Sequence, residues 1–187
     1  MYLHLLLMSL QHLILGVLKY HPLTGYDLNK AFQSSVQHFW NTDQSQIYRA
    51  LYKLHEHGWI EVEISVQADA PIKKLYTLTE AGQAELHRWL ATPAPLASIH
   101  EAWLGQLFFG AELRAEEIKT LLESRIAALQ GLLEVFTQDI PASAQAYAER
   151  FDAERDLQFW LLTLEYGREK LLFDLRWAQQ VLGRLPK

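Results

Sequence analysis

The stretch QSQIYRALYKL, residues 44–54, combines a helical hydrophobic pattern with polar side chains on every other face. Ile47, Leu51 and Leu54 recur at intervals of four and three, so they lie on one side of a helix. The other faces contain amide, phenol and cationic groups. Such a helix can bury one edge in a core and expose its other faces. Those faces are either ordinary solvated surface or a surface that enters a DNA groove, and the surrounding sequence is needed to distinguish the two.

The composition indicates a globular protein and excludes cysteine chemistry. The 187 residues are 50% hydrophobic and include no cysteine, so disulfides and thiolate metal sites are excluded and a reducing, cytoplasmic setting is expected. The net charge of −5 argues against an indiscriminate nucleic-acid binder. Residues 1–90 are nearly balanced, with seven Lys and Arg against eight Asp and Glu, so a local basic patch remains possible there.

The first twenty residues, MYLHLLLMSLQHLILGVLKY, are strongly apolar. No Lys or Arg precedes the apolar run and no small-residue cleavage site follows it, which is unlike a signal peptide. His4, Ser9, Gln11 and His12 interrupt it, which is unlike a membrane span. We expect a buried helix and no contact with a membrane.

Three helices are predicted in the first part of the chain. The first covers residues 8–20 and ends before His21-Pro22. Thr24 is expected to cap the second, whose apolar positions continue to Val36 and Phe39. Asp43 or Ser45 caps the third helix, which runs to His57 and stops at Gly58.

A hairpin and a fourth helix are predicted to follow. WIEVEISV alternates with a period of two, QADAPI is a turn, and KKLYTLT is a second short strand. Thr79 then caps a helix in which Leu86, Trp89 and Leu90 face inward. The order of three helices and a hairpin predicts a winged helix-turn-helix DNA-binding domain over residues 1–90. In this fold the third helix enters the major groove and the hairpin wing lies on the backbone.

A helical second domain is predicted after the proline-containing linker ATPAPLAS at 91–98. Within residues 99–187 we expect helices over 99–110 and 115–137, a break at QDIPAS, and one long helix over 143–183. The long helix has a heptad seam for dimerisation, formed by Leu157, Leu161, Leu164, Leu171, Leu175 and Leu182. A second apolar stripe beside it includes Phe159, Leu162, Tyr166 and Phe173. One helix with two apolar stripes needs two partners, so we expect an antiparallel hairpin within the chain and a C2 homodimer. The fold class is therefore mainly α with a small β-hairpin, and the C-terminal domain is coiled-coil-like.

The motifs LTGYDLNKAF, SQIYRALYKLHEHGWIEVE and PIKKLYTLTEAGQAEL, in this order, resemble the PadR family of bacterial transcriptional regulators. The helical tail resembles the longer subgroup of that family. The resemblance implies a dimeric winged-helix DNA binder, with Ser45, Gln46, Tyr48, Arg49 and Lys53 in the recognition helix and Pro71, Lys73, Lys74 and Tyr76 in the wing. One departure is visible, because the family wing usually reads Gly-Arg-Pro and this chain reads Asp69-Ala70-Pro71.

The expected DNA contacts divide into base readers and phosphate binders. The Gln46 amide is suited to adenine and the Arg49 guanidinium to guanine. The side chains suited to phosphate are those of Tyr48, Tyr52, Lys53, Lys73 and Lys74. The alternative is that all of these are ordinary solvated side chains.

Other ligand classes have weaker signals. Trp89, Trp103 and Phe108 lie near the junction of the two parts and are candidates for binding a small aromatic effector, with structural packing as the default. The eight histidines have no metal-ligand spacing, and no phosphate loop or nucleophile motif is present, so no catalytic residue, metal or cofactor is expected. The leading prediction is a homodimeric repressor that binds a pseudo-palindromic operator. The alternative is a helical protein–protein adaptor that has lost DNA binding.

Overall fold

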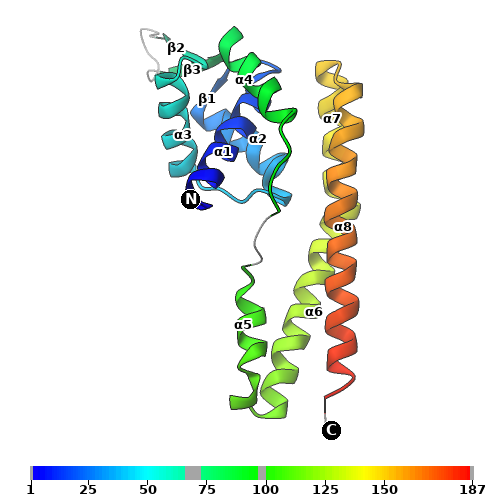
Figure 1. Ribbon diagram of the computed structural model, residues 1–187. Coiled ribbons are helices and arrows are strands. Elements are labelled where there is room, and N and C mark those ends of the chain that lie inside the picture. The colour runs from blue at the N-terminus through cyan, green and yellow to red at the C-terminus, as the bar shows by residue number, and fades with distance from the viewer. Residues whose placement is uncertain (1, 66–72, 97–99, 186–187) are drawn as a thin grey trace. The chain divides into compact units, whose positions relative to one another are not determined.

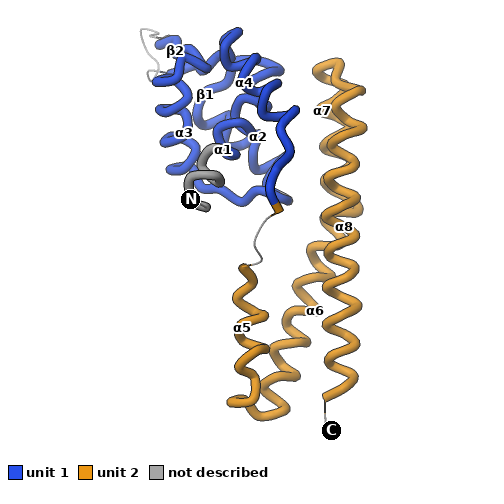
Figure 2. The backbone as a smooth tube through the Cα atoms, in the orientation of Figure 1, with its two compact units in different colours: residues 1–95 blue, residues 96–187 orange. Residues whose placement is uncertain are grey.

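The computed structural model describes residues 2–65, 73–96 and 100–185. The chain divides into two compact units, residues 1–95 and residues 96–187 (Figure 2). The structure is mainly helical with one small antiparallel sheet, which confirms the predicted fold class. The expected wing turn QADAPI, with Asp69 and Pro71, lies outside the described residues.

Unit 1 contains four α-helices and a three-stranded sheet within its described residues (Figure 1). The elements are α1 (Tyr2–Leu18), β1 (Leu23–Thr24), α2 (Gly25–Ser34), the 3-10 turn η1 (Val36–His38), α3 (Gln44–Glu56), β2 (Ile60–Ser65), β3 (Lys73–Leu78) and α4 (Glu80–Leu90). The strand order is β1-β3-β2 and both pairings are antiparallel. The predicted hairpin is therefore present, with Val62 opposite Tyr76 in its register.

The core of unit 1 is formed where the helices meet the base of the sheet. Helix α3 packs against α1 and α2, and α4 packs against α1. The largest fully buried side chains are those of His12, Ile14, Leu15, Leu28, Phe32, Ile47, Leu51, Leu54 and Ile60. Because α1 contacts three of the other helices, the apolar N-terminal segment is a core helix, as its interrupted pattern predicted.

Three expectations for unit 1 are wrong. Helix α2 ends at Ser34, and Phe39, which was expected to continue its apolar positions, is 48% exposed. The helix ends there because the hydroxyl groups of Ser34 and Ser35 donate hydrogen bonds to backbone carbonyl oxygens of the preceding turn, at Lys30 and Ala31. Leu90, expected to face inward, is 67% exposed, since α4 turns only Leu86 and part of Trp89 toward the core. Helix α1 also spans Tyr2–Leu18 instead of 8–20.

Unit 2 is helical throughout its described elements. They are α5 (Ala102–Phe108), the 3-10 turn η2 (Gly110–Glu112), α6 (Ala115–Thr137), α7 (Asp139–Phe151) and α8 (Glu154–Leu182). Helices α6 and α8 lie side by side along most of α6 (Figure 1). Gly167 permits this approach, because a Cβ atom there would overlap the Phe136 ring of α6.

The single long helix expected over residues 143–183 is wrong. The chain breaks at Asp152, whose φ of 49° is left-handed, and α8 starts only at Glu154. Asp tolerates this conformation better than most residues, and the Ala153 N–H donates to the Ala148 carbonyl to close the end of α7. The expected break at QDIPAS is present but short, because α6 ends at Thr137, α7 begins at Asp139, and only Gln138 lies between them. Pro141 falls in the first turn of α7, where no intrahelical N–H donor is needed, so it does not lengthen the break.

None of the described helices combines the length and the apolar character that a membrane crossing requires.

Candidate nucleic-acid interface

Helix α3 is anchored by one apolar edge and exposed on its other faces. Ile47, Leu51 and Leu54 are at most 1% exposed and Ala50 is 4% exposed. Ser45, Tyr48, Arg49, Tyr52 and Lys53 are all exposed on the outside of the same helix. The structure therefore brings five of the predicted contact residues onto one displayed surface, in the third helix of a winged helix-turn-helix fold.

A capping box fixes the N-terminus of α3. The Gln46 backbone N–H donates to Asp43 Oδ1 at 2.8 Å, and the Asp43 N–H donates to Gln46 Oε1 at 3.1 Å. The Ser45 hydroxyl donates to Asp43 Oδ1 at 2.6 Å. The Ser45 hydrogen bond, with the Gln46 N–H and the charge of Arg49, holds the pKa of Asp43 below its ordinary value. Asp43 is thus a carboxylate at neutral pH, which suits the positive end of a helix dipole.

Gln46 has a structural role that the sequence pattern did not reveal. Its Oε1 accepts from the Thr42 hydroxyl at 2.9 Å as well as from the Asp43 N–H. A bidentate contact with adenine uses both the carbonyl and the amino group of the side chain. In this conformation the carbonyl is already engaged, so only the amino group of Gln46 is free of the cap. Of the two predicted base readers, Arg49 is the one that is exposed.

Tyr48 also contributes to the position of α3. Its ring lies against Gly25, the first residue of α2, where an added Cβ would come within 2.6 Å of the ring. The side chain is still 42% exposed. A tyrosine that packs on one side and faces solvent on the other can hold two helices together and still reach a phosphate. No periodicity in the sequence signals this contact with glycine.

The remaining cations lie on α3 and on the wing. Arg49 is within 3.5 Å of the Ser45 hydroxyl, one turn earlier on the exposed face. Lys73 and Lys74 are exposed on β3, opposite Ser65 and Ile64 of β2. Tyr52 is 66% exposed, and its hydrogen bond to Glu56 raises the pKa of its phenol. Because Tyr52 donates to a neighbouring carboxylate, it is the least suited of the predicted residues to contact phosphate.

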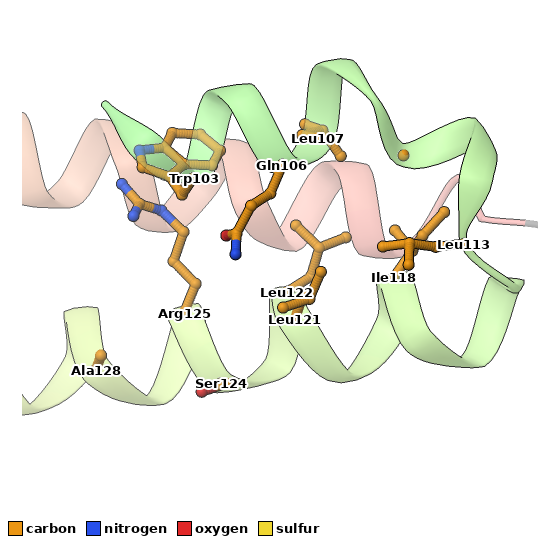
Figure 3. Close-up of a pocket in the computed structure, with 11 residues that line it drawn as sticks. Trp103, Gln106, Leu107, Leu113, Ile118, Leu121, Leu122, Ser124, Arg125 and Ala128 are labelled. Carbon is orange, nitrogen blue, oxygen red and sulfur yellow. The ribbon is translucent and has the colours of Figure 1, made fainter. Parts of the chain in front are cut away.

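The three candidate effector residues have different surroundings. Trp89 belongs to unit 1, where it stacks on the buried His12 with ring centroids 5.0 Å apart. Trp103 belongs to unit 2, where it packs on Arg125 and Trp177. Phe108 is 81% exposed and meets Phe109 edge to face. Of the three, only Trp103 lines a described pocket (Figure 3). Arg125, which stacks on Trp103, lines the same pocket and was not predicted as a site residue.

The predicted dimerisation residues divide by burial within the single chain. Leu164 is 5% exposed and packs inside unit 2, whereas Leu161 is 42% exposed. Leu157, Leu171, Leu175 and Leu182 are half-buried. The second stripe is more open, with Phe159, Leu162, Tyr166 and Phe173 between 57% and 74% exposed. The seam thus serves partly for packing within the chain, and the second stripe offers the larger apolar surface.

Possible metal ligands do not cluster in the described part of the chain. Among the residues that the structure describes, no three His, Asp or Glu side chains come together as a metal site would require. A winged helix with an exposed polar third helix, followed by a long helical unit, instead defines a winged-helix transcriptional regulator.

Comparisons with known proteins identify the family. Residues 14–88 match the transcriptional regulator PadR-like family, and residues 99–186 match the family described as virulence activator alpha C-term. The negative transcriptional regulator PadR of Bacillus subtilis (strain 168) is 29% identical over 182 residues, which cover 95% of this chain and 98% of that protein. The N-terminal unit therefore belongs to the PadR-like family of transcriptional regulators, and the helical C-terminal region resembles that of the longer members of this family.

Solved structures agree with this assignment. The crystal structure of Bacillus subtilis PadR in complex with operator DNA has a TM-score of 0.74 and 27% identity, covering 94% of this chain and 98% of the other. The same protein in complex with p-coumaric acid has a TM-score of 0.70 and 25% identity, covering 93% and 96%. The Vibrio cholerae virulence activator AphA has a TM-score of 0.68 and 26% identity, covering 93% and 96%.

The contact between Tyr48 and Gly25 leads to a test by double-mutant cycle. Gly25→Ala should lower the free energy of unfolding by about 1–3 kcal/mol, because the added methyl group displaces a packed ring. In a Tyr48→Ala background the same change should cost less than about 0.5 kcal/mol. Urea unfolding at one fixed protein concentration measures all four free energies. An equal cost in both backgrounds would show that Gly25 is needed for some other reason.

Proposed function

We propose that the protein is a homodimeric repressor that binds a pseudo-palindromic operator through α3 and the wing. The observation that supports this most directly is the exposed outer face of α3, whose inner edge is fully buried. Arg49 is suited to reading a guanine in the major groove, and Ser45 lies one turn before it. Tyr48, Lys53, Lys73 and Lys74 are suited to phosphate contacts that set the register. The operator complex of the Bacillus subtilis relative supports DNA as the partner.

The dimer is proposed from the apolar surface of unit 2. Phe159, Leu162, Tyr166 and Phe173 are large, exposed and carried by one helix, and Leu132 and Val135 of α6 are 49% and 41% exposed. Large apolar side chains exposed in this number on one unit mark a protein–protein interface more often than a solvated face. A second copy of the chain related by twofold symmetry would also give the two recognition helices that a pseudo-palindrome requires.

The relatives also support proposals on repression, ligand response and location. The Bacillus subtilis relative is a negative transcriptional regulator, which favours a repressor over an activator. Its structure with p-coumaric acid supports a response to a small aromatic ligand in this chain as well. A regulator of DNA would act in the cytoplasm, consistent with a sequence free of cysteine.

A protein–protein adaptor is the second candidate, favoured by the acidic charge balance. The net charge is −5, and the wing strand β2 exposes Glu61 and Glu63 beside the cations of β3. Acidic groups this close to the wing weaken its attraction to phosphate. The two candidates differ sharply in how they respond to DNA and to salt.

Fluorescence anisotropy with labelled DNA from the protein's own upstream region separates these candidates. A scrambled duplex of equal length is the control, and a salt series spans physiological ionic strength. A DNA-binding regulator should prefer the upstream sequence, and its affinity should fall by about two to five orders of magnitude from low to moderately high salt, because phosphate contacts release counterions. Equal binding to both duplexes, or none at any salt, would favour the adaptor.

The dimer surface is tested by Phe173→Glu, with Gln179→Glu as a matched control on the same helix. Phe173 is 58% exposed in the single chain, so the change should leave the fold of unit 2 intact. A carboxylate buried in the interface without a partner should weaken dimerisation at least about tenfold. Gln179 is exposed and outside the stripe, so its variant should behave like the parent. Sedimentation equilibrium measures the dissociation constants, and a Phe173→Glu protein as dimeric as the control would contradict the assignment.

A further inference from the structure

The first turn of α3 begins with three polar side chains, and the capping box engages two of them. The Gln46 carbonyl oxygen accepts from the Thr42 hydroxyl at 2.9 Å and from the Asp43 N–H at 3.1 Å. The Ser45 hydroxyl donates its hydrogen to Asp43 Oδ1 at 2.6 Å. Gln44 is the third side chain, at the first helical position, and it is exposed. Within the described part of the chain, its side-chain amide makes no hydrogen bond.

A glutamine with both ends of its amide available, at the start of this helix, is suited to the major-groove edge of adenine. In that contact the amide carbonyl accepts from adenine N6 and the amino group donates to N7, so both ends of the side chain are used. Gln44 has both ends available, whereas the carbonyl of Gln46 is already engaged. The N-terminal residues of a recognition helix are the ones that contact base edges. Gln44 therefore meets the requirement that the sequence pattern had assigned to Gln46.

The charge at the start of α3 favours a base edge over a phosphate as the partner of Gln44. Asp43 directly precedes Gln44, and the hydrogen bonds from the Ser45 hydroxyl and the Gln46 N–H hold the pKa of its carboxyl below the ordinary value. Asp43 is therefore negatively charged at neutral pH. A carboxylate at this position repels phosphate oxygens, whereas it does not exclude the neutral edge of a base.

The spacing of Gln44 and Arg49 limits how far apart their bases lie. Five positions along α3 correspond to a rise of about 7.5 Å. The Arg49 side chain reaches back toward the first turn, since its Nη2 lies 3.5 Å from the Ser45 hydroxyl. Because successive base pairs are about 3.4 Å apart, the two side chains reach bases that are at most about two positions apart. Both bases therefore belong to one half-site.

We propose that Gln44 is the adenine-reading residue of α3, through a bidentate contact with N6 and N7 in the major groove, and that Gln46 serves the helix cap. The half-site then contains an adenine within about two base pairs of the guanine that Arg49 reads. This assignment deepens the DNA-binding function proposed above and rests on it. It identifies a specificity-determining residue that the resemblance in the sequence did not include.

Fluorescence anisotropy of the full-length protein tests the assignment, with labelled duplexes from the upstream DNA that the parent binds. The duplexes carry every single base-pair substitution in one half-site. Replacing the adenine should weaken binding of the parent about 5- to 150-fold. Gln44→Ala should bind the original and the adenine-substituted duplexes equally, and it should keep the guanine preference. Gln46→Ala should keep the adenine preference, while its urea midpoint should fall because the cap is lost.

A modified base and a matched variant separate direct reading from indirect effects. 7-Deazaadenine lacks the N7 acceptor and keeps its pairing with thymine, so it should weaken the parent and leave the affinity of Gln44→Ala unchanged. Gln83→Ala replaces an exposed glutamine on α4 of the same unit and should behave like the parent on every duplex. Alanine is the best helix former, so Gln44→Ala should fold like the parent, which circular dichroism verifies.

The assignment is overturned if Gln44→Ala keeps the full adenine preference of the parent, or if its loss of affinity is the same on every duplex, as a phosphate contact would give. A parent that discriminates between bases, with Arg49→Ala losing the guanine preference and Gln44→Ala losing nothing, would reject the role of Gln44 and leave the DNA-binding function standing. A parent with no base preference at all would reject the proposed function, and the role of Gln44 with it.

Discussion

The burial of one edge of α3 is the constraint on which the DNA-binding unit depends. Ile47, Leu51 and Leu54 are held against α1 and α2, so the opposite face of the helix must point outward. The capping box of Asp43 and Gln46 then fixes where the helix begins, and Tyr48 on Gly25 fixes its position beside α2. The outer face is polar, and the described residues of unit 1 leave it exposed, which is the property that a DNA groove requires.

Most elements of unit 1 could be predicted because local chemistry marks their ends. Thr24, Asp43 and Thr79 each accept a hydrogen bond from a backbone N–H three residues later, and Gly58 takes a left-handed φ of 69° after α3. These signals involve residues close in sequence, so they can be read without a structure. The role of Gln46 could not be predicted this way, because the same amide serves equally well as a cap or as a base reader. Only its actual partners decide between the two.

The helical unit was harder to predict because a heptad pattern does not say which chain it packs against. Leu164 belongs to the seam and is buried inside the single chain, whereas Phe159 and Phe173 of the second stripe are exposed. The break at Asp152 was missed for a related reason, since a one-residue left-handed turn leaves the hydrophobic pattern on both sides undisturbed. The stacking of Arg125 on Trp103 could not be predicted from the repeat of α6 either, because it depends on α5, a separate segment of the chain.

The central claim is that α3 reads bases while the wing holds phosphates, and the binding of single-base operator variants tests it most directly. Affinities of the parent, Arg49→Ala and Lys74→Ala proteins would be measured against every single substitution in one half-site. Arg49→Ala should lose discrimination at one base pair, by about 1–3 kcal/mol, and keep it elsewhere. Lys74→Ala should weaken all sequences uniformly. If the Arg49→Ala protein kept the full base preference of the parent, the claim that α3 recognises bases through Arg49 would be contradicted.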